Sequence, residues 1–293
     1  MRYDSPTRRR LRAVSRLARS MAHRSSFPTA RIVRAYWWDG HANFGDALTP
    51  WLLRPRGVVP VLVPPERAQV VGVGSILEHL PRDFSGLVWG TGLIADHRLE
   101  LPNARFLAVR GHWTRERLGL TGGMAVGDPA LLAATVLPRP VVCWPLGIIP
   151  HADHHGDPVL RSFLARHPGT VRFIDVRRGP DHVVREIASC AAVLSTSLHG
   201  LVIADSYDIP AAWATLTPPL IGDTFKFHDH ESVVTPGRSR RVELRADATV
   251  GDIVALTARA DRDRVSESVE RLAAAVDAFP ASRDLPLLAG RRR

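Results

Sequence analysis

A single histidine, His199, stands between a serine pair and a glycine in the stretch STSLHGLVIADSYDIPA, residues 195 to 211. An apolar run precedes it and a helix-compatible apolar run follows it, so the pattern places His199 on a turn from a buried strand into a helix. Open α/β sheets bind their ligands at such turns. An imidazole there can exchange a proton near neutral pH, although a buried histidine that hydrogen-bonds a strand carbonyl would give the same pattern.

Three further charged side chains stand where a strand ends or a helix begins. Asp46 closes the motif NFGD, and its carboxylate either caps the following helix or serves as a general base at the mouth of a cleft. Arg110 ends an apolar segment, where a guanidinium can clamp an anion. Lys226 is the single lysine among 39 basic residues, which indicates either a need for a compact ammonium or chance retention.

The elements that must position these residues are apolar runs alternating with helix-like patterns from residue 31 to about 215. This alternation predicts an α/β architecture with parallel sheets. The expected strands are 31–38, 58–63, 69–74, 86–90 and 105–110 in the first half, and 141–146, 171–176, 191–196 and 211–215 in the second. The expected helices are 44–53, 158–167, 180–190 and 198–207, with a further amphipathic helix packing on the body within 250–278. Two similar halves joined near Pro138 predict a cleft between them.

The length and composition predict a globular protein of two domains, because 293 residues with 45% hydrophobic side chains can form two cores of ordinary size. The expected division is a basic arm over 1–28, an N-terminal domain over 29–137, a C-terminal domain with its terminal helix over 138–280, and a basic tail over 281–293. Cys143 and Cys190, the two cysteines, lie in apolar segments, which predicts reduced, buried thiols.

The net charge of +10 lies at the two ends of the chain. Residues 1–24 carry +7 and the last three arginines carry +3, so the residues between them are formally neutral. This distribution does not indicate a basic groove, and we expect no nucleic-acid partner. Apolar residues near helical spacing among the first arginines indicate either an amphipathic segment for an anionic membrane surface or a solvated arm. We expect a cytoplasmic protein, which the first interpretation places at the inner face of the plasma membrane.

Two other patterns have simpler explanations than a bound cofactor or metal. The stretch VGVGS at 71–75 lacks the third glycine of a dinucleotide-binding loop, because Leu77 occupies that position, and a tight strand-to-helix turn explains it. HADHH at 151–155 and FHDH at 227–230 contain many metal-ligand types, but adjacent ligands rarely all face one ion. We therefore expect no metal.

Taken together, the motifs resemble those of the polysaccharide pyruvyl transferase family. They occur in that order over roughly residues 31–235, and they are NFGDALTPWLL, VGVGSIL, VWGTGLI, VRG, GDPALL, IIPHADHH, STSLHGLVIADSYDIPAAW and KFHDH. The resemblance implies two Rossmann-like domains facing a central cleft, similar to B-type glycosyltransferases. It also implies phosphoenolpyruvate as the donor substrate with no separate cofactor, and a pyruvate ketal on a polysaccharide sugar or its lipid-linked precursor as the product. Many relatives carry an arginine two residues before the histidine, where this chain has Ser197.

On this resemblance His199 is expected to be the general acid, and Asp46 the general base for an attacking sugar hydroxyl. The phosphate and carboxylate of the donor require several cations, hydroxyls and N–H groups. The residues expected to provide them are Arg110, Lys226, Ser195, Ser197, Gly200 and Leu201, and those expected to contact donor or acceptor are Asn43 and His151. Two other functions stay open, namely a nucleotide-sugar glycosyltransferase of the same architecture and a non-catalytic relative in polysaccharide assembly.

Overall fold

Two parallel β-sheets form the centre of the computed structural model, which describes residues 31–40 and 42–280. The first sheet has the order β2-β1-β3-β4-β5-β6, and its strands are β1 (Arg31–Tyr36), β2 (Val58–Leu62), β3 (Val70–Val71), β4 (Leu87–Trp89), β5 (Arg105–Val109) and β6 (Ala125–Val126). The second has the order β10-β9-β7-β8, with β7 (Trp144–Ile149), β8 (Val171–Phe173), β9 (Cys190–Ser195) and β10 (Ala211–Trp213). All pairings between these strands are parallel, which confirms the predicted α/β architecture. The similarity to B-type glycosyltransferases stays a prediction.

Both sheets change their winding direction beside their first strand. β1 lies between β2 and β3, and β7 lies between β8 and β9. In open α/β sheets a ligand crevice forms at such a switch point, outside the carboxyl ends of the strands. The loops after β1, β3, β7 and β9 are therefore the places where this fold can build a site.

Helices cover the sheets, and the helix after β9 is buried on every side. The helices are α2 (Leu48–Leu53), α3 (His112–Arg117), α4 (Ala133–Val136), α5 (Pro158–Arg166), α6 (Pro180–Ala188), α7 (Leu198–Ser206), α8 (Phe225–Val234), α9 (Val250–Leu256) and α10 (Arg262–Ala275), with short 3₁₀ turns such as η4 (Pro129–Leu132) and η5 (Ala152–His154). In α7 the eight residues from Leu198 to Asp205 are buried, as a helix that is apolar all round must be.

Gly200 lets α7 start close to the second sheet. A Cβ atom at this position would lie 2.3 Å from the Ser195 hydroxyl oxygen and 2.8 Å from a methyl carbon of Ile149. A larger residue would therefore push the helix away from β7 and β9, and His199 would move with it.

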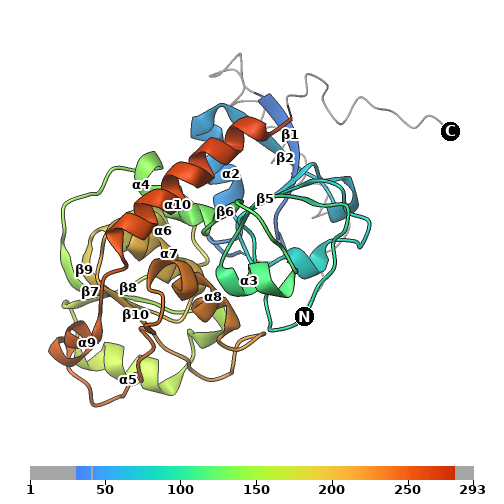
Figure 1. Ribbon diagram of the computed structural model, residues 1–293. Coiled ribbons are helices and arrows are strands. Elements are labelled where there is room, and N and C mark those ends of the chain that lie inside the picture. The colour runs from blue at the N-terminus through green and yellow to red at the C-terminus, as the bar shows by residue number, and fades with distance from the viewer. Residues whose placement is uncertain (1–30, 41, 281–293) are drawn as a thin grey trace, which may run out of the picture.

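Helix α10, near the end of the described residues, packs against the first sheet. Figure 1 shows α10 running between the two lobes of the molecule. The indole N–H of Trp89 in β4 donates to the Leu272 carbonyl at 3.0 Å, and the Ser268 hydroxyl donates to the Val126 carbonyl in β6 at 3.0 Å. The single helix predicted within 250–278 is thus two helices, because Thr249 and Asp261 each cap the start of one.

Other differences from the predicted elements have local causes. The apolar run 141–146 was expected to be a strand, but Val141, Val142 and Cys143 are exposed and β7 begins at Trp144. The prediction that both thiols are buried is therefore wrong for Cys143 and confirmed for Cys190. Within the described ranges no helix is both long and apolar enough to cross a bilayer. The arm and tail predictions for 1–28 and 281–293 lie outside the described residues.

Candidate active site

Charged side chains from both sheets gather at the carboxyl ends of the strands. Asp46 follows β1, Arg110 follows β5 and Asp128 follows β6, while His199 follows β9. The backbone N–H of Phe44 donates to the Val176 carbonyl at 2.8 Å, so the loop after β1 is fixed to the second half of the molecule. The two switch points in the sheets predict a ligand site at this position.

The start of α7 is shaped by the Ser195 hydroxyl. Its oxygen lies 3.0 Å from the Ile149 carbonyl and 2.6 Å from the Ser197 carbonyl, and it accepts the N–H of Ser197 at 3.0 Å. Ser195 and Ser197 are only 1% and 4% exposed. In this structure Ser195 thus holds the turn before the helix, and its expected contact with a donor stays a prediction, as does that of Ser197.

Gly200 and Leu201 were expected to contact the donor through their N–H groups, and this stays a prediction. The N–H groups of Gly200 and Leu201 both donate to the Ser197 carbonyl, at 3.1 Å and 3.4 Å, so they are already used. The first N–H groups of a helix have no acceptor inside the helix. Among the described residues those of Leu198 and His199 have no acceptor, and these two are the groups able to bind an anion.

His199 is a buried ring beside the carboxylate of Asp128. Its Nε2 lies 3.7 Å from Asp128 Oδ2, and its ring packs edge-to-face against Phe44 with centroids 6.3 Å apart. Burial is the largest influence on the ring and lowers the pKa of His199 to about 4, against the opposing effect of the Asp128 charge. The expected imidazolium near neutral pH is therefore absent here, because burial penalises the charged ring.

Asp46 and Lys226 both have pKa values close to neutral pH. Burial raises the pKa of Asp46 to about 7, although the positive charge of Lys226 opposes the shift. Burial lowers the pKa of Lys226 to about 8, and the nearby charge of Arg110 lowers it further. Lys226 is 9% exposed, and no described residue hydrogen-bonds its ammonium, which lies 5.9 Å from the centre of the Phe227 ring. This ammonium is available for an anion.

Arg110 is held inside the protein. Its three nitrogens donate to Asp229 Oδ2 at 2.8 Å, to the Ser75 hydroxyl at 2.5 Å and to the Leu93 carbonyl at 2.5 Å, and the side chain is fully buried. Its charge acts on Lys226 and on His199. These bonds hold the guanidinium in place in this structure, and its predicted contact with a donor stays a prediction.

Asn43 and His151 belong to the loops after β1 and β7. The Asn43 side-chain oxygen accepts the N–H of Gly45 at 3.0 Å and so shapes the turn that leads to Asp46. The backbone N–H of His151 donates to the Thr196 hydroxyl at 2.9 Å, which ties its loop to the turn before α7. Both residues lie in loops that border the site, and their predicted substrate contacts stay predictions.

The sequence analysis did not single out Asp128, Asp229 or Gly45. Asp128 lies within the quoted motif GDPALL, and its position directly after a strand was the available signal. Gly45 lies within NFGD, but only the fold brings it close to the His199 ring, because the two residues are 154 positions apart in the sequence. Asp229 lies in α8, a helix that was not predicted.

Metal ligands do not converge in the described part of the chain. No three His, Cys, Asp or Glu side chains there form a group able to hold a metal ion. In HADHH, for example, the His154 ring binds the Thr196 hydroxyl and the Pro218 carbonyl, at 2.7 Å and 2.9 Å.

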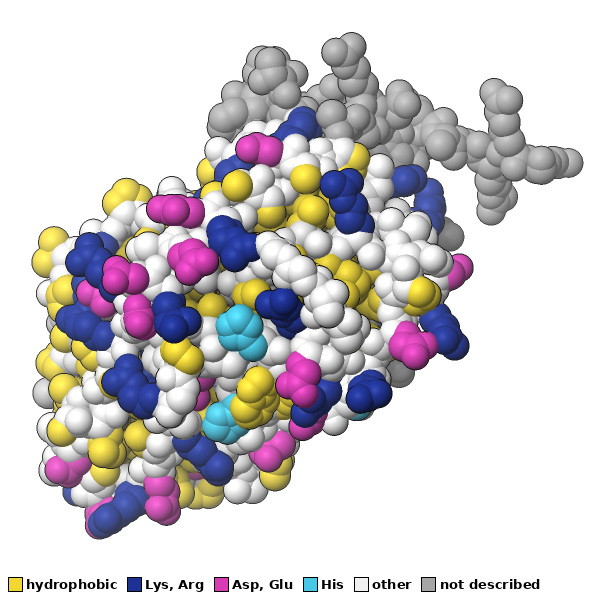
Figure 2. Space-filling model, in the orientation of Figure 1, with side chains coloured by type: hydrophobic (Ala, Val, Ile, Leu, Met, Phe, Trp, Pro, Cys, Tyr) yellow, Lys and Arg dark blue, Asp and Glu magenta, His cyan; other side chains and the backbone are white. Residues whose placement is uncertain are grey.

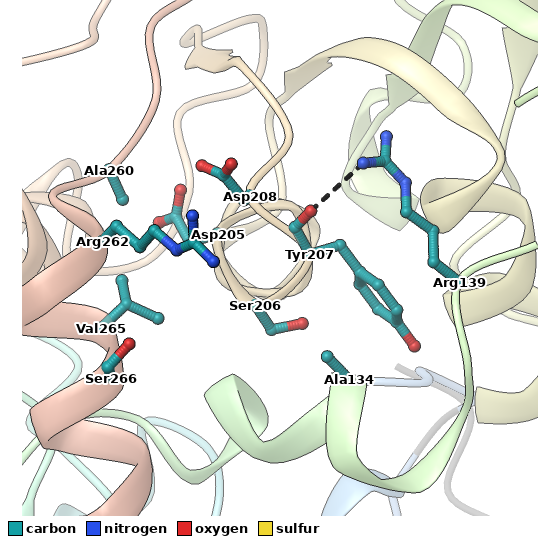
Figure 3. Close-up of a pocket in the computed structure, with 10 residues that line it drawn as sticks. All are labelled: Ala134, Arg139, Asp205, Ser206, Tyr207, Asp208, Ala260, Arg262, Val265 and Ser266. Atoms are coloured by element: carbon teal, nitrogen blue, oxygen red, sulfur yellow. Dashed lines mark hydrogen bonds between the residues drawn. The ribbon is translucent and has the colours of Figure 1, made fainter.

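A cavity of about 420 Å³ lies at the other end of α7. Figure 3 shows it between the C-terminal end of α7, α4 and the start of α10, with Arg139 hydrogen-bonded to the Tyr207 carbonyl. Asp205 on its wall is held by Arg240, at 2.5 Å and 2.9 Å. This cavity therefore shares a helix with His199 but none of the charged groups described above.

Comparison with known proteins shows which family the chain resembles. The family model "Polysaccharide pyruvyl transferase" matches residues 86–215, a segment that includes Arg110, Asp128, His151 and His199. The match covers 130 of the 293 residues, and over this segment the chain is similar to that family. The family resemblance expected from the motifs is thereby confirmed.

Two relatives extend the similarity beyond that segment. The succinoglycan biosynthesis protein ExoV of Rhizobium meliloti (strain 1021) is 28% identical over 241 residues, which are 73% of this chain and 70% of that protein. The uncharacterized protein L143 of Acanthamoeba polyphaga mimivirus is 30% identical over 173 residues, which are 55% of this chain and 58% of that protein. The chain thus spans more than two thirds of the first relative and less than two thirds of the second.

Proposed function

We propose that the protein transfers the enolpyruvyl group of phosphoenolpyruvate to a sugar of a polysaccharide or its lipid-linked precursor, forming a pyruvate ketal and releasing phosphate. The observation that carries this proposal is the convergence of Asp46, Lys226 and His199 at the ends of two parallel sheets. The match of residues 86–215 to the family model supports pyruvyl transfer, and the similarity to a succinoglycan biosynthesis protein supports a polysaccharide acceptor.

The site can bind a small anion with several negative charges. The Lys226 ammonium and the N–H groups of Leu198 and His199 have no partners among the described residues. Phosphate and carboxylate groups bind such helix N-termini and ammonium groups. The buried charge of Arg110 adds to the local positive potential.

Asp46 and His199 can move the protons that ketal formation requires. Asp46 takes the proton of the first sugar hydroxyl as its oxygen bonds to the central carbon of the donor, and His199 donates a proton to the methylene carbon. The second hydroxyl then attacks the same carbon, its proton returns to His199, and phosphate leaves with the proton that Asp46 holds. Each group thus ends in its starting state.

The neutral state of His199 is compatible with this role once the donor is bound. A phosphate and a carboxylate close to the ring stabilise its charged form, so they raise the pKa of His199 from about 4 toward neutral pH. Protonation of the ring would then be coupled to donor binding.

The test is phosphate release from phosphoenolpyruvate with a depyruvylated polysaccharide as acceptor. The wild-type chain should turn over, and His199→Ala should lose about 10²- to 10⁴-fold in kcat while it keeps its melting temperature. Lys226→Met should raise the KM for phosphoenolpyruvate. Thermal stabilisation by nucleotide sugars and not by phosphoenolpyruvate would instead indicate a glycosyltransferase.

A further inference from the structure

Two buried polar atoms face one another in the site, and neither has a hydrogen-bond partner among the residues that the structure describes. They are Nε2 of His199 and Oδ2 of Asp128, separated by 3.7 Å. Buried polar atoms are almost always hydrogen-bonded, because an unpaired one costs its full desolvation penalty. A shift of about 0.8 Å would bring the two atoms to the usual N–H···O distance of about 2.9 Å. A small movement of either side chain is therefore enough for the pair to form a bond.

We propose that Asp128 is a positioning residue that keeps the proton of neutral His199 on Nε2, and that Nδ1 is the nitrogen that exchanges a proton with the substrate. Gly45 is the second positioning residue, because the lack of a side chain lets its loop lie against the Nδ1 edge of the ring. The assignment of the tautomer stands on the geometry alone, whereas the step at the substrate rests on the proposed function.

The loop after β6 fixes the direction of the Asp128 carboxylate. Oδ1 of Asp128 accepts the N–H of Ala130 at 2.9 Å, which caps η4 and leaves Oδ2 toward His199. Gly127 precedes it at φ +150°, a conformation that L-residues rarely adopt, and a Cβ there would lie 3.0 Å from Ser268 of α10. The carboxylate is thus held by its loop independently of His199.

Nδ1 has different surroundings from Nε2. Among the described residues it has no hydrogen-bond partner, yet it is not among the buried unsatisfied atoms, so the 8% of His199 that is exposed includes this edge. A Cβ atom on residue 45 would lie 2.1 Å from Nδ1 and 2.7 Å from the neighbouring ring carbon. Any side chain at position 45 would therefore collide with this edge of the ring and displace Nδ1.

The proton path follows from these two environments. A carboxylate accepts hydrogen bonds and cannot donate one, so Oδ2 favours the Nε2–H form of the neutral ring. When an anionic donor binds, Nδ1 gains a proton and later passes it to the methylene carbon of the enolpyruvyl group, which returns the ring to the Nε2–H form. The charges that face His199 are those of Asp128, which favours the imidazolium, and of Arg110, Lys226 and His230, which oppose it.

The tautomer can be measured without any substrate. In protein labelled with ¹⁵N-histidine, two-bond N–H correlations distinguish a proton on Nε2 from one on Nδ1, and His199→Gln identifies the signal of this ring. The wild-type chain at pH 7 should show the Nε2–H form. Asp128→Asn should shift the ring toward Nδ1–H, because the amide oxygen can still accept from Ala130 while the NH₂ group now donates to Nε2. A wild-type ring protonated on Nδ1 would overturn the proposal, even if the variant does not fold.

Kinetics then test the role of Nδ1 in the reaction. Asp128→Asn should lower kcat about 10²- to 10⁴-fold with little change in the KM for phosphoenolpyruvate, and Asp128→Glu should recover part of the loss. Gly45→Ala should show a comparable loss, whereas Gly156→Ala, where an added Cβ meets nothing within 4 Å, should not. Wild-type turnover with an unaffected Gly45→Ala variant would contradict the inference, whereas a wild-type chain that releases no phosphate would contradict the proposed function instead.

Discussion

The guanidinium of Arg110 lies 2.8 Å from the carboxylate of Asp229, and both side chains are completely buried. The pair joins the end of β5 to α8, and therefore the first sheet to the helix that carries Lys226. Asp229 also accepts the N–H and the hydroxyl of Thr114, at 2.8 Å and 2.6 Å. This buried group of polar contacts fixes α8, the helix that carries Lys226, against the end of β5 and the start of α3.

Loss of the Asp229 carboxylate should destabilise the protein strongly. Asp229→Ala leaves the charge of Arg110 buried and unpaired, so the free energy of unfolding should fall by about 3–5 kcal/mol. Urea denaturation measures the change. The matched control is Glu100→Ala, which removes the partner of Arg82 from an ion pair whose side chains are 79% and 76% exposed. That variant should change the free energy of unfolding by less than about 1 kcal/mol, and equal effects of the two variants would contradict the structural role of Asp229.

The pH dependence of kcat/KM should report Asp46 and Lys226. As a base Asp46 must be ionised, so activity should rise with pH through its pKa of about 7. Lys226 must be protonated to bind the donor, so activity should fall above its pKa of about 8. Initial rates of phosphate release between pH 5 and pH 10 measure both limbs.

A conservative variant shows whether Lys226 causes the fall in activity at alkaline pH. Lys226→Arg keeps a positive charge with a pKa above about 12, so its residual activity should not fall between pH 8 and pH 10. An alkaline limb that is unchanged in Lys226→Arg would show that another group causes it.

The surroundings of Asp46 should also appear in the pH dependence of stability. Its pKa is about 7 in the folded protein and near 3.8 in the unfolded chain, so the folded state binds more protons between these values. The free energy of unfolding of the wild type should therefore fall, relative to that of Asp46→Asn, as pH rises from 4 to 7. The difference should exceed about 1 kcal/mol at pH 8 and be smallest at pH 4. Urea denaturation at the two pH values tests this, and a constant difference would contradict the assigned environment.

Apolar patterning predicts much of the fold because the core strands are short apolar runs bounded by polar residues, glycine or proline. β9 (Cys190–Ser195) and the following α7 were expected almost at their observed limits. β7 starts three residues later than predicted, because the apolar residues 141–143 are exposed. Their exposure cannot be inferred from their apolar side chains alone. Charges interspersed over the face that carries α3 and α8, shown in Figure 2, agree with the neutral body inferred from the sequence.

Contacts between distant residues could not be predicted in the same way. Helix α8 was missed because it buries Asp229, His230 and Glu231, which a hydrophobic pattern does not reveal. Their partners are Arg110, Asp205 and Arg240, each brought close by the fold. For the same reason the sequence did not reveal the buried partner of Arg110, which is 119 residues away.

Ser195→Ala distinguishes a structural role of this hydroxyl from a contact with the donor. Without the hydroxyl, the buried N–H of Ser197 loses its acceptor, which should lower the free energy of unfolding by about 1–3 kcal/mol. Because the turn positions His199, kcat for phosphate release should also fall, while the KM for phosphoenolpyruvate stays within about twofold. Ser206→Ala is the control, since that hydroxyl donates only to the Ile203 carbonyl at the far end of the same helix. A large rise in KM with unchanged stability would instead show that Ser195 binds the donor, as the sequence alone suggested.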